Sequence, residues 1–103
     1  MLSNFFNCRL DYANFTSCTI RTSTFINCSL KESLFTATDV SDVVFENCNL
    51  QDAIFENTVA KNTDFRTAIN YKIDPEHNVL TGAKFTTKGL QGLLGKYKLD
   101  IED

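Results

Sequence analysis

The chain has 103 residues, of which 43% are hydrophobic, and a formal net charge of −3 at pH 7, which is typical of one small folded domain. Its ten lysines and arginines form no cluster that could follow a phosphate backbone, so we expect no direct binding of nucleic acid. Because the N-terminal segment lacks the features of a signal peptide and no apolar run is long enough to span a bilayer, we expect no membrane span and a cytoplasmic location.

The first seventy residues repeat with a period of five. Every fifth position is apolar, and the residue two positions before each apolar residue is small. An α-helix advances about 140° net per five residues, and a flat strand would place successive members on opposite faces. Neither element fits this spacing. The apolar positions are Phe5, Leu10, Phe15, Ile20, Phe25, Leu30, Phe35, Val40, Phe45, Leu50, Phe55, Ala60 and Phe65.

The pattern is satisfied if the chain turns a corner once in every pentad. The small and the large residue then point inward, and the other three residues form the corner and the outer surface. The near-copies "FFNCRL", "FINCSL" and "FENCNL" begin at positions 5, 25 and 45, so four pentads complete one coil and residue n stacks on residue n+20. Stacked backbones lie about 4.8 Å apart, and like side chains can therefore pack in columns. The sequence predicts a β-solenoid.

This small-x-large-x-x pattern resembles the pentapeptide-repeat family, and the resemblance covers residues 1–70. It implies an all-β solenoid, a right-handed quadrilateral β-helix. It implies function much less well, because members of the family share a shape across many unrelated roles. We consider two roles. One role is a non-catalytic module that presents flat faces for protein–protein interaction or self-association. The other is protection of a topoisomerase, since some proteins with this fold are similar to B-DNA in shape and charge and occupy gyrase.

Residues 71–103 are predicted to form a loop, a last coil segment and a C-terminal cap. The segment "NYKIDPEH", 70–77, breaks the pattern, and Pro75 favours a turn, so we expect an excursion from the solenoid wall. Phe85 returns to the five-residue frame beneath Phe65. Leu90, Leu93 and Leu94 share one face of a helix, with Thr86 or Thr87 as N-cap. They predict a short capping α-helix.

No residues group into an active site. The four cysteines, Cys8, Cys18, Cys28 and Cys48, all occupy the small inward position, which favours packing over metal binding. His77 follows the proline turn and is interpreted as a solvated loop residue. We therefore predict a protein that is not an enzyme and holds no cofactor or metal.

Two surfaces are candidates for contact with a partner protein that the sequence does not identify. Leu34 and Ile54 stack in one outward column, and Phe6 and Ile26 stack in another. The first coil has no cap comparable to the C-terminal one, so two copies could associate end to end. That homodimer would form around Ser3, Asn4 and Phe5.

The net charge of the chain distinguishes between the two roles, interaction module and DNA mimic. Outward positions in residues 1–70 carry five basic and eight acidic side chains, a net charge of −3. Four coils make a rod about 19 Å long, and DNA of that length carries roughly eleven charges. The chain is a poor mimic, and the interaction module is the favoured interpretation.

Overall fold

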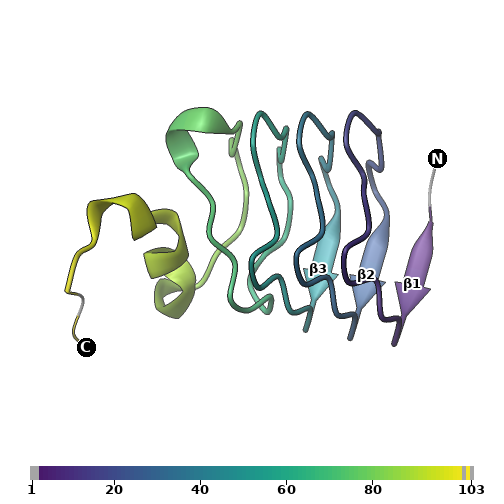
Figure 1. Cartoon of the computed structure of the whole chain (residues 1–103), viewed down its shortest axis with the longest axis horizontal. Coiled ribbons are helices and arrows are strands. Elements are labelled where there is room, and N and C mark those ends of the chain that lie inside the picture. The colour runs from purple at the N-terminus through teal and green to yellow at the C-terminus, as the bar shows by residue number, and fades with distance from the viewer. Residues whose placement is uncertain (1–2, 101, 103) are drawn as a thin grey trace.

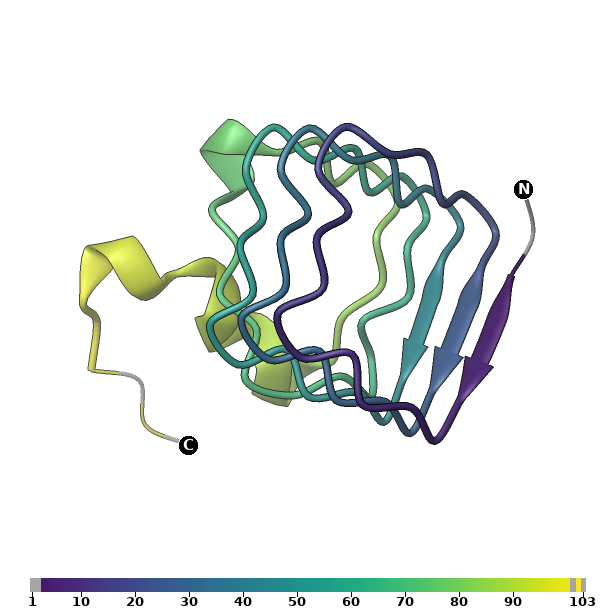
Figure 2. The same cartoon turned by 45° about the vertical axis from the view of Figure 1, so that its right-hand side comes forward.

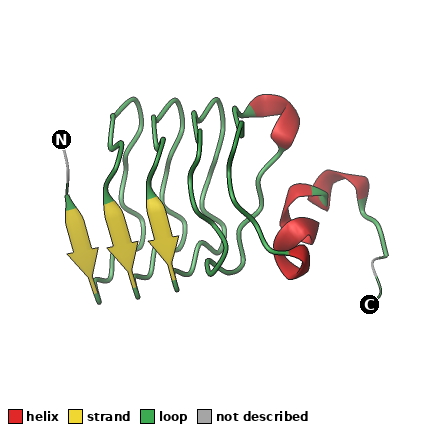
Figure 3. Ribbon diagram, turned by 180° about the vertical axis from the view of Figure 1, so that it is seen from behind, coloured by secondary structure: helices red, strands yellow, loops and turns green. Residues whose placement is uncertain are grey.

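The computed structural model describes residues 3–100 and 102 and shows a stack of coils that ends in short helices (Figure 1). Three strands, β1 (Asn4–Phe6), β2 (Thr24–Ile26) and β3 (Val44–Glu46), form a parallel sheet in that order. Three 3-10 helices follow, η1 (Pro75–His77), η2 (Thr87–Leu93) and η3 (Gly95–Tyr97). The strands lie on one side of the stack, and the helices gather toward its C-terminal end (Figure 3).

The stacking register is twenty residues, as the sequence predicted. Phe5 pairs with Phe25, and Phe25 pairs with Phe45. Isolated parallel bridges repeat the same spacing on the other sides of the coils, and the successive coils follow nearly the same path (Figure 2). The period of five and the stacking of residue n on residue n+20 are therefore both confirmed. The first bridges of these three sides join Arg9 to Ser29, Asn14 to Leu34 and Thr19 to Asp39.

The corners explain why the outer positions are rich in Asn and Asp. At one corner Tyr12 has a φ of 66°, and the Ala13 N–H donates to the Leu10 carbonyl over 3.1 Å. A positive φ at the third residue together with such an i to i+3 bond defines a type II turn. Asn and Asp tolerate this left-handed conformation better than other residues with side chains. Five corners place Asn there: Asn7, Asn27, Asn47, Asn57 and Asn62.

Phenylalanine columns fill the interior. Phe25 stacks on Phe5 and Phe45 with ring centroids 4.9 and 5.4 Å apart, and Phe85 stacks on Phe65 at 5.2 Å. A neighbouring column contacts this one edge to face, as between Phe35 and Phe45 at 5.8 Å (Phe15 and Phe55 complete that second column). Each fully buried ring contributes about 1.5–3 kcal/mol. The predicted column packing is confirmed, including the return of Phe85.

The small inward residues also satisfy hydrogen bonds. The Thr38 and Thr58 hydroxyls each donate over 2.7 Å to the carbonyl of the residue 23 positions earlier, and the Cys48 thiol donates over 3.2 Å to Phe25. Cys48 and Cys28 are buried, as expected for packing. Cys18 is exposed, however, because it lies in the first coil. Within the described residues, no buried side-chain nitrogen or oxygen lacks a partner.

The capping α-helix predicted for the C-terminal segment is wrong. η2 and η3 are 3-10 helices, although Thr86 does serve as N-cap and accepts from the Gly89 N–H at 3.3 Å. A 3-10 helix has three residues per turn, which aligns glycines three positions apart on one face. A methyl group on Gly92 would lie 2.5 Å from the Tyr71 carbonyl oxygen, so this glycine allows the helix to approach closely.

The predicted leucine lid is correct only in part. Leu93 packs against the core, and Leu94 is half-buried. Leu90 is 43% exposed. Leu90 and Leu93 share a face in a 3-10 helix as well, but Gly89 and Gly92 are the residues that lie directly against Tyr71.

Candidate interaction surface

Each side of the solenoid is a ladder of short extended segments, one from each coil, which we call rungs. One side lacks a rung. The bridges on this side run from Asn14 to Leu34 and from Leu34 to Ile54, and there they end. The two neighbouring sides continue for one more coil, to Ile69 and to Val79. The segment that connects these two residues leaves the wall, as the break in the pattern predicted. The gap is therefore one rung deep and lies directly after Ile54.

The departing segment turns two of its side chains into the core. Tyr71 is buried, and its ring lies 5.8 Å from Phe65 and 5.6 Å from Phe85. Burial raises the pKa of the Tyr71 hydroxyl, which donates to the Gly89 carbonyl over 2.8 Å. Ile73 is also buried, and its N–H donates to the Gly92 carbonyl over 2.9 Å. These contacts fix the excursion to the helical cap.

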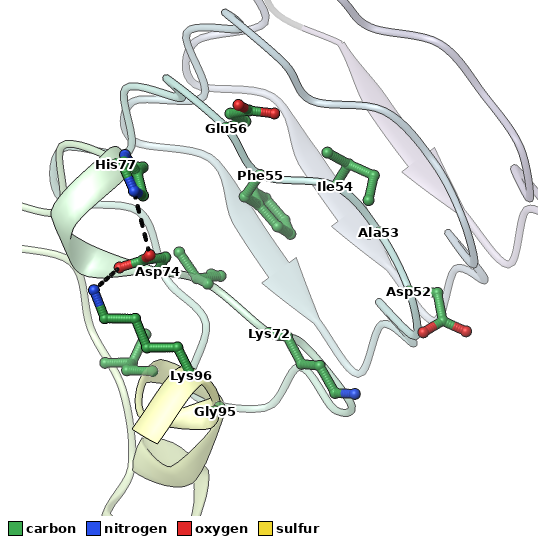
Figure 4. A pocket seen from close by; sticks show the side chains of 13 residues that line it. Asp52, Ala53, Ile54, Phe55, Glu56, Lys72, Asp74, His77, Gly95 and Lys96 are labelled. Atoms are coloured by element: carbon green, nitrogen blue, oxygen red, sulfur yellow. Dashed lines mark ion pairs between the residues drawn. The ribbon is translucent and has the colours of Figure 1, made fainter. Parts of the chain in front are cut away.

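A pocket of about 470 Å³ lies at the missing rung. In the close-up, the segment from Asp52 to Glu56 runs along one wall, and Asp74, His77 and Lys96 lie across from it (Figure 4). Charged side chains lie around an apolar lining. An apolar interior with a polar rim suits a protein or peptide ligand. The apolar lining residues are Ala53, Ile54, Phe55, Ile73 and Leu93.

Ion pairs join the cap to η1 and its N-cap residue on one side of the pocket. The Lys96 ammonium lies 2.7 Å from a Glu76 oxygen and 3.5 Å from an Asp74 oxygen, and Asp74 also lies 3.6 Å from the His77 ring nitrogen. The hydrogen bond from Lys96 lowers the pKa of Glu76, and the same bond raises the pKa of Lys96. The Glu76 N–H, followed by Lys96, lowers the pKa of Asp74. These charges are used to hold the cap in place.

The two predicted apolar pairs occupy different sides of the solenoid. Leu34 is half-buried, and Ile54 is 44% exposed and lines the pocket. Phe6 is 56% exposed and lies beside the half-buried Ile26 in the pairing of β1 with β2. The structure therefore does not combine them into one surface. The pocket itself was not predicted, although Pro75 and the glycines spaced by three mark the segments that form it.

The predicted self-association end consists of Ser3 and the first two residues of β1, Asn4 and Phe5. The Ser3 carbonyl accepts from the Thr24 N–H over 2.9 Å, Asn4 is exposed, and Phe5 stacks on Phe25. Phe5, Leu10, Phe15 and Ile20 of the first coil are half-buried, whereas their counterparts in the second coil are fully buried.

The described residues were also searched for metal sites and for membrane-spanning helices. No group of three or more His, Cys, Asp or Glu side chains among them could hold a metal ion. None of the helices in residues 3–100 is long and apolar enough to cross a membrane.

The stacked pentads define a pentapeptide-repeat solenoid, and comparison with known proteins agrees. The family profile described as "Pentapeptide repeat region" matches residues 1–70. The chain belongs to the pentapeptide-repeat family. Among curated proteins no sequence relative was found.

Solved structures with a similar fold include HetL, a pentapeptide-repeat protein involved in heterocyst differentiation regulation from Nostoc sp. strain PCC 7120. Its TM-score is 0.58 at 14% identity, over 79% of this chain and 38% of HetL. QnrB1, a plasmid-mediated fluoroquinolone resistance protein, has a TM-score of 0.47 at 14% identity, over 96% of this chain and 58% of the QnrB1 chain. The chain spans less than two thirds of either structure, and such identities show the fold alone.

Proposed function

We propose that this chain is a non-catalytic module that binds another protein through the outer surface of its solenoid. The observation that carries the proposal is Ile54, an apolar side chain 44% exposed on a sheet ladder and beside a pocket with an apolar lining. Contiguous apolar surface of this kind is typical of interaction sites. The inward positions, by contrast, are occupied by packing and by hydrogen bonds between coils.

The test compares two matched double variants in capture experiments from source lysate. Leu34→Lys with Ile54→Lys alters the ladder beside the pocket, and Phe6→Lys with Ile26→Lys alters the other apolar pair. We expect the first variant to lose a protein that the second retains, because only the first pair includes a residue that lines the pocket, Ile54. Mass spectrometry of the bound fractions gives the answer. If both variants capture the same proteins as the unmodified chain, the proposal is wrong.

We also propose that the coils wind as a right-handed quadrilateral β-helix. Four pentads per coil support four sides, and parallel strands are joined by right-handed connections in nearly all proteins. A crystal structure tests both features directly, and a left-handed path would contradict the proposal.

Self-association through the first coil is a further part of the proposed function. The half-buried rings of that coil support it, as do the Arg9, Asn14 and Thr19 amides, which have no hydrogen-bond partner among residues 3–100 and 102. Two first coils in contact would bury both sets. Light scattering should show a dimer that Lys or Pro at Ser3 and Asn4 converts to a monomer. A monomeric unmodified protein at high concentration would contradict this arrangement.

Protection of gyrase by DNA mimicry is the weaker candidate. The molecule extends 39 Å along its longest axis, and DNA of that length carries about 23 charges. Acidic side chains are also paired, as in the contact of Asp64 with Arg66 at 2.9 Å. We therefore expect a gyrase supercoiling assay to give the same result with and without the protein. Inhibition or protection at stoichiometric concentration would favour mimicry instead.

A further inference from the structure

The side of the solenoid that contains Ile54 has a regular hydrogen-bond pattern up to the gap. The Phe15 N–H donates to the Leu34 carbonyl over 2.8 Å, and the Leu34 N–H donates to the Ala13 carbonyl over 2.9 Å. One coil further on, the Phe35 N–H donates to the Ile54 carbonyl over 2.9 Å, and the Ile54 N–H donates back to Ser33 over 2.9 Å. Each rung thus gives one bond to the next rung and receives one from it.

This pattern stops at Ile54 and leaves backbone groups unpaired. By the same register, the Phe55 N–H would donate to a next rung and the Ala53 carbonyl would accept from it. Asp52 N–H would be a second donor, because the equivalent Glu32 N–H donates to the Gln51 carbonyl over 2.9 Å. Within residues 3–100 and 102, none of these three groups has a hydrogen-bond partner. They form a short β-edge, and such edges pair readily with added strands.

The edge borders the pocket, and the gap is closed at both ends. Asp52, Ala53 and Phe55 all line the pocket. Beyond the gap the ladder resumes, since the Asn57 N–H donates to the His77 carbonyl over 2.8 Å and the Asn78 side chain donates to the Phe55 carbonyl over 3.0 Å. On the other side Ile69 is already paired with Asn49. The opening therefore admits one extended segment of about a pentad.

The side chains beside the edge define what such a segment must carry. Phe55 ends a stacked column, with its ring 4.9 Å from Phe35, and no aromatic ring among the described residues continues it. A large apolar side chain of an added segment would pack against Ile54 and the edge of Phe55 in the pocket, because the buried Ile73 already occupies part of the inward space. Ile73, the residue twenty positions after Ala53, is buried in the same lining, so an added segment has room for only a small side chain beside Ala53.

We propose that the gap binds an extended peptide segment of a partner protein, which adds as a parallel rung below Ile54. The inference rests on the proposed function as an interaction module and names its ligand class: small residue, any residue, large apolar residue. Main-chain bonds to an exposed sheet edge supply affinity, and alternate side chains supply specificity. A second copy of this chain cannot dock here coil on coil, because the neighbouring sides at Ile69 and Val79 are already occupied.

The experiment uses a peptide that this fold already accepts as a rung. KESLFTA, residues 31–37, carries Ser33 and Phe35 at the inward positions. The matched control KELSFTA has the same composition but places leucine where only a small residue fits. In amide NMR spectra, KESLFTA should shift the Asp52 and Phe55 signals and slow their hydrogen exchange. The control peptide should bind about tenfold more weakly, a difference of about 1.4 kcal/mol.

A blocking variant tests whether binding occurs in the pocket. Gly95 lines the pocket, and an added Cβ there would have no atom within 4 Å, so Gly95→Phe can fill the space without a clash at the backbone. It should abolish peptide binding, whereas Thr16→Phe, on the exposed surface of the first coil, should not. Far-UV circular dichroism checks that both variants fold.

Three outcomes would overturn the peptide rung. The first is equal hydrogen-exchange protection of the Phe35 and Phe55 amides in the free protein. The second is undiminished peptide binding by a folded Gly95→Phe variant. The third is a concentration-dependent shift of the Phe55 amide signal without peptide, which would indicate a second copy in the gap. If the peptide fails while Leu34→Lys with Ile54→Lys still loses a captured partner, the module function stands and only the rung is wrong. Loss of both would refute the two proposals together.

Discussion

The coils formed by residues 3–69 and the region formed by residues 70–100 fill their interior and pair their backbone groups in different ways. In the coils, equivalent positions have equivalent environments, so that Phe25 and Phe45 are both fully buried. In the C-terminal region the inward space is filled by Tyr71, which falls outside the five-residue frame, and by Ile73, a large residue at a position where the coils have a small one. A regular repeat pairs its own backbone groups between coils. Unpaired groups beside apolar side chains arise here where the repeat is interrupted.

The largest expected effect separates inward from outward positions in the coils. Phe45→Ala should reduce the free energy of unfolding by about 3–5 kcal/mol, because it leaves a cavity between two stacked rings. Glu46→Ala, one position away and exposed, should change it by less than about 0.5 kcal/mol. Phe85→Ala should fall between them, since Phe85 is half-buried at the end of the same column. Urea denaturation measures all three, and equal losses would contradict the inward and outward assignment.

The second prediction concerns the contact between the cap and Tyr71. Gly92→Ala should destabilise the protein by about 1–3 kcal/mol, because the new methyl group would overlap the backbone and ring of Tyr71. Gly95→Ala is the matched control, since nothing lies within 4 Å of its added methyl group. It should be neutral or stabilising by up to about 1 kcal/mol, through the unfolded state. Thermal unfolding distinguishes the two, and equal melting temperatures would mean that the cap does not pack as described.

The third prediction uses the cysteines to compare the first coil with the interior. Burial raises the pKa of the Cys48 thiol to about 11, whereas Cys18 is exposed. A thiol reagent at pH 8 should therefore modify Cys18 first and Cys48 last, because the thiolate is the reactive form. Cys48→Ala should cost about 1 kcal/mol, because it removes the hydrogen bond from the thiol to the Phe25 carbonyl. Stoichiometric zinc in native mass spectra of the purified protein would contradict the packing role.

The architecture of the coils could be predicted because it depends on local repetition alone. The spacing of Phe5, Phe25 and Phe45 specifies the number of pentads per coil, and it also places Phe85 under Phe65. The corners carry a signal as well, in the Asn and Asp residues that adopt positive φ. Ile54 was identified as a candidate because its outward position is apolar.

The pocket and the 3-10 cap could not be predicted from periodicity, since both depend on contacts between segments without a repeat. The approach of Gly89 and Gly92 to Tyr71 replaces the leucine face that the α-helical spacing indicated. Ile73 stands at a small inward position of the five-residue frame, and the cap pairs with its amide through the Gly92 carbonyl. The glycine spacing of three residues was the signal available for the cap, and it is compatible with both kinds of helix.

The smallest expected effect is a pH dependence confined to the cap. The folded-state pKa values of Asp74 and Glu76 lie below their ordinary values of 3.8 and 4.5, chiefly through the Glu76 N–H and Lys96 respectively. A lowered pKa means that the stabilising contribution is present above the ordinary value and is lost as the pH falls through the folded value, below about 4. The effect should be modest, because exposed ion pairs are screened by solvent.

The readout is the hydrogen-exchange protection of the Ile73 amide, which bonds to the Gly92 carbonyl, relative to the Phe35 amide in the coils. The ratio removes the intrinsic pH dependence of exchange. Between pH 6 and pH 3, protection of Ile73 should fall relative to Phe35, because protonated Asp74 and Glu76 no longer hold Lys96. Lys96→Met should reduce this relative change by removing the cation, and the part that comes from the Glu76 N–H on Asp74 should remain. An unchanged ratio in the unmodified protein would mean that packing on Tyr71, and not the ion pairs, holds the cap against the broken coil.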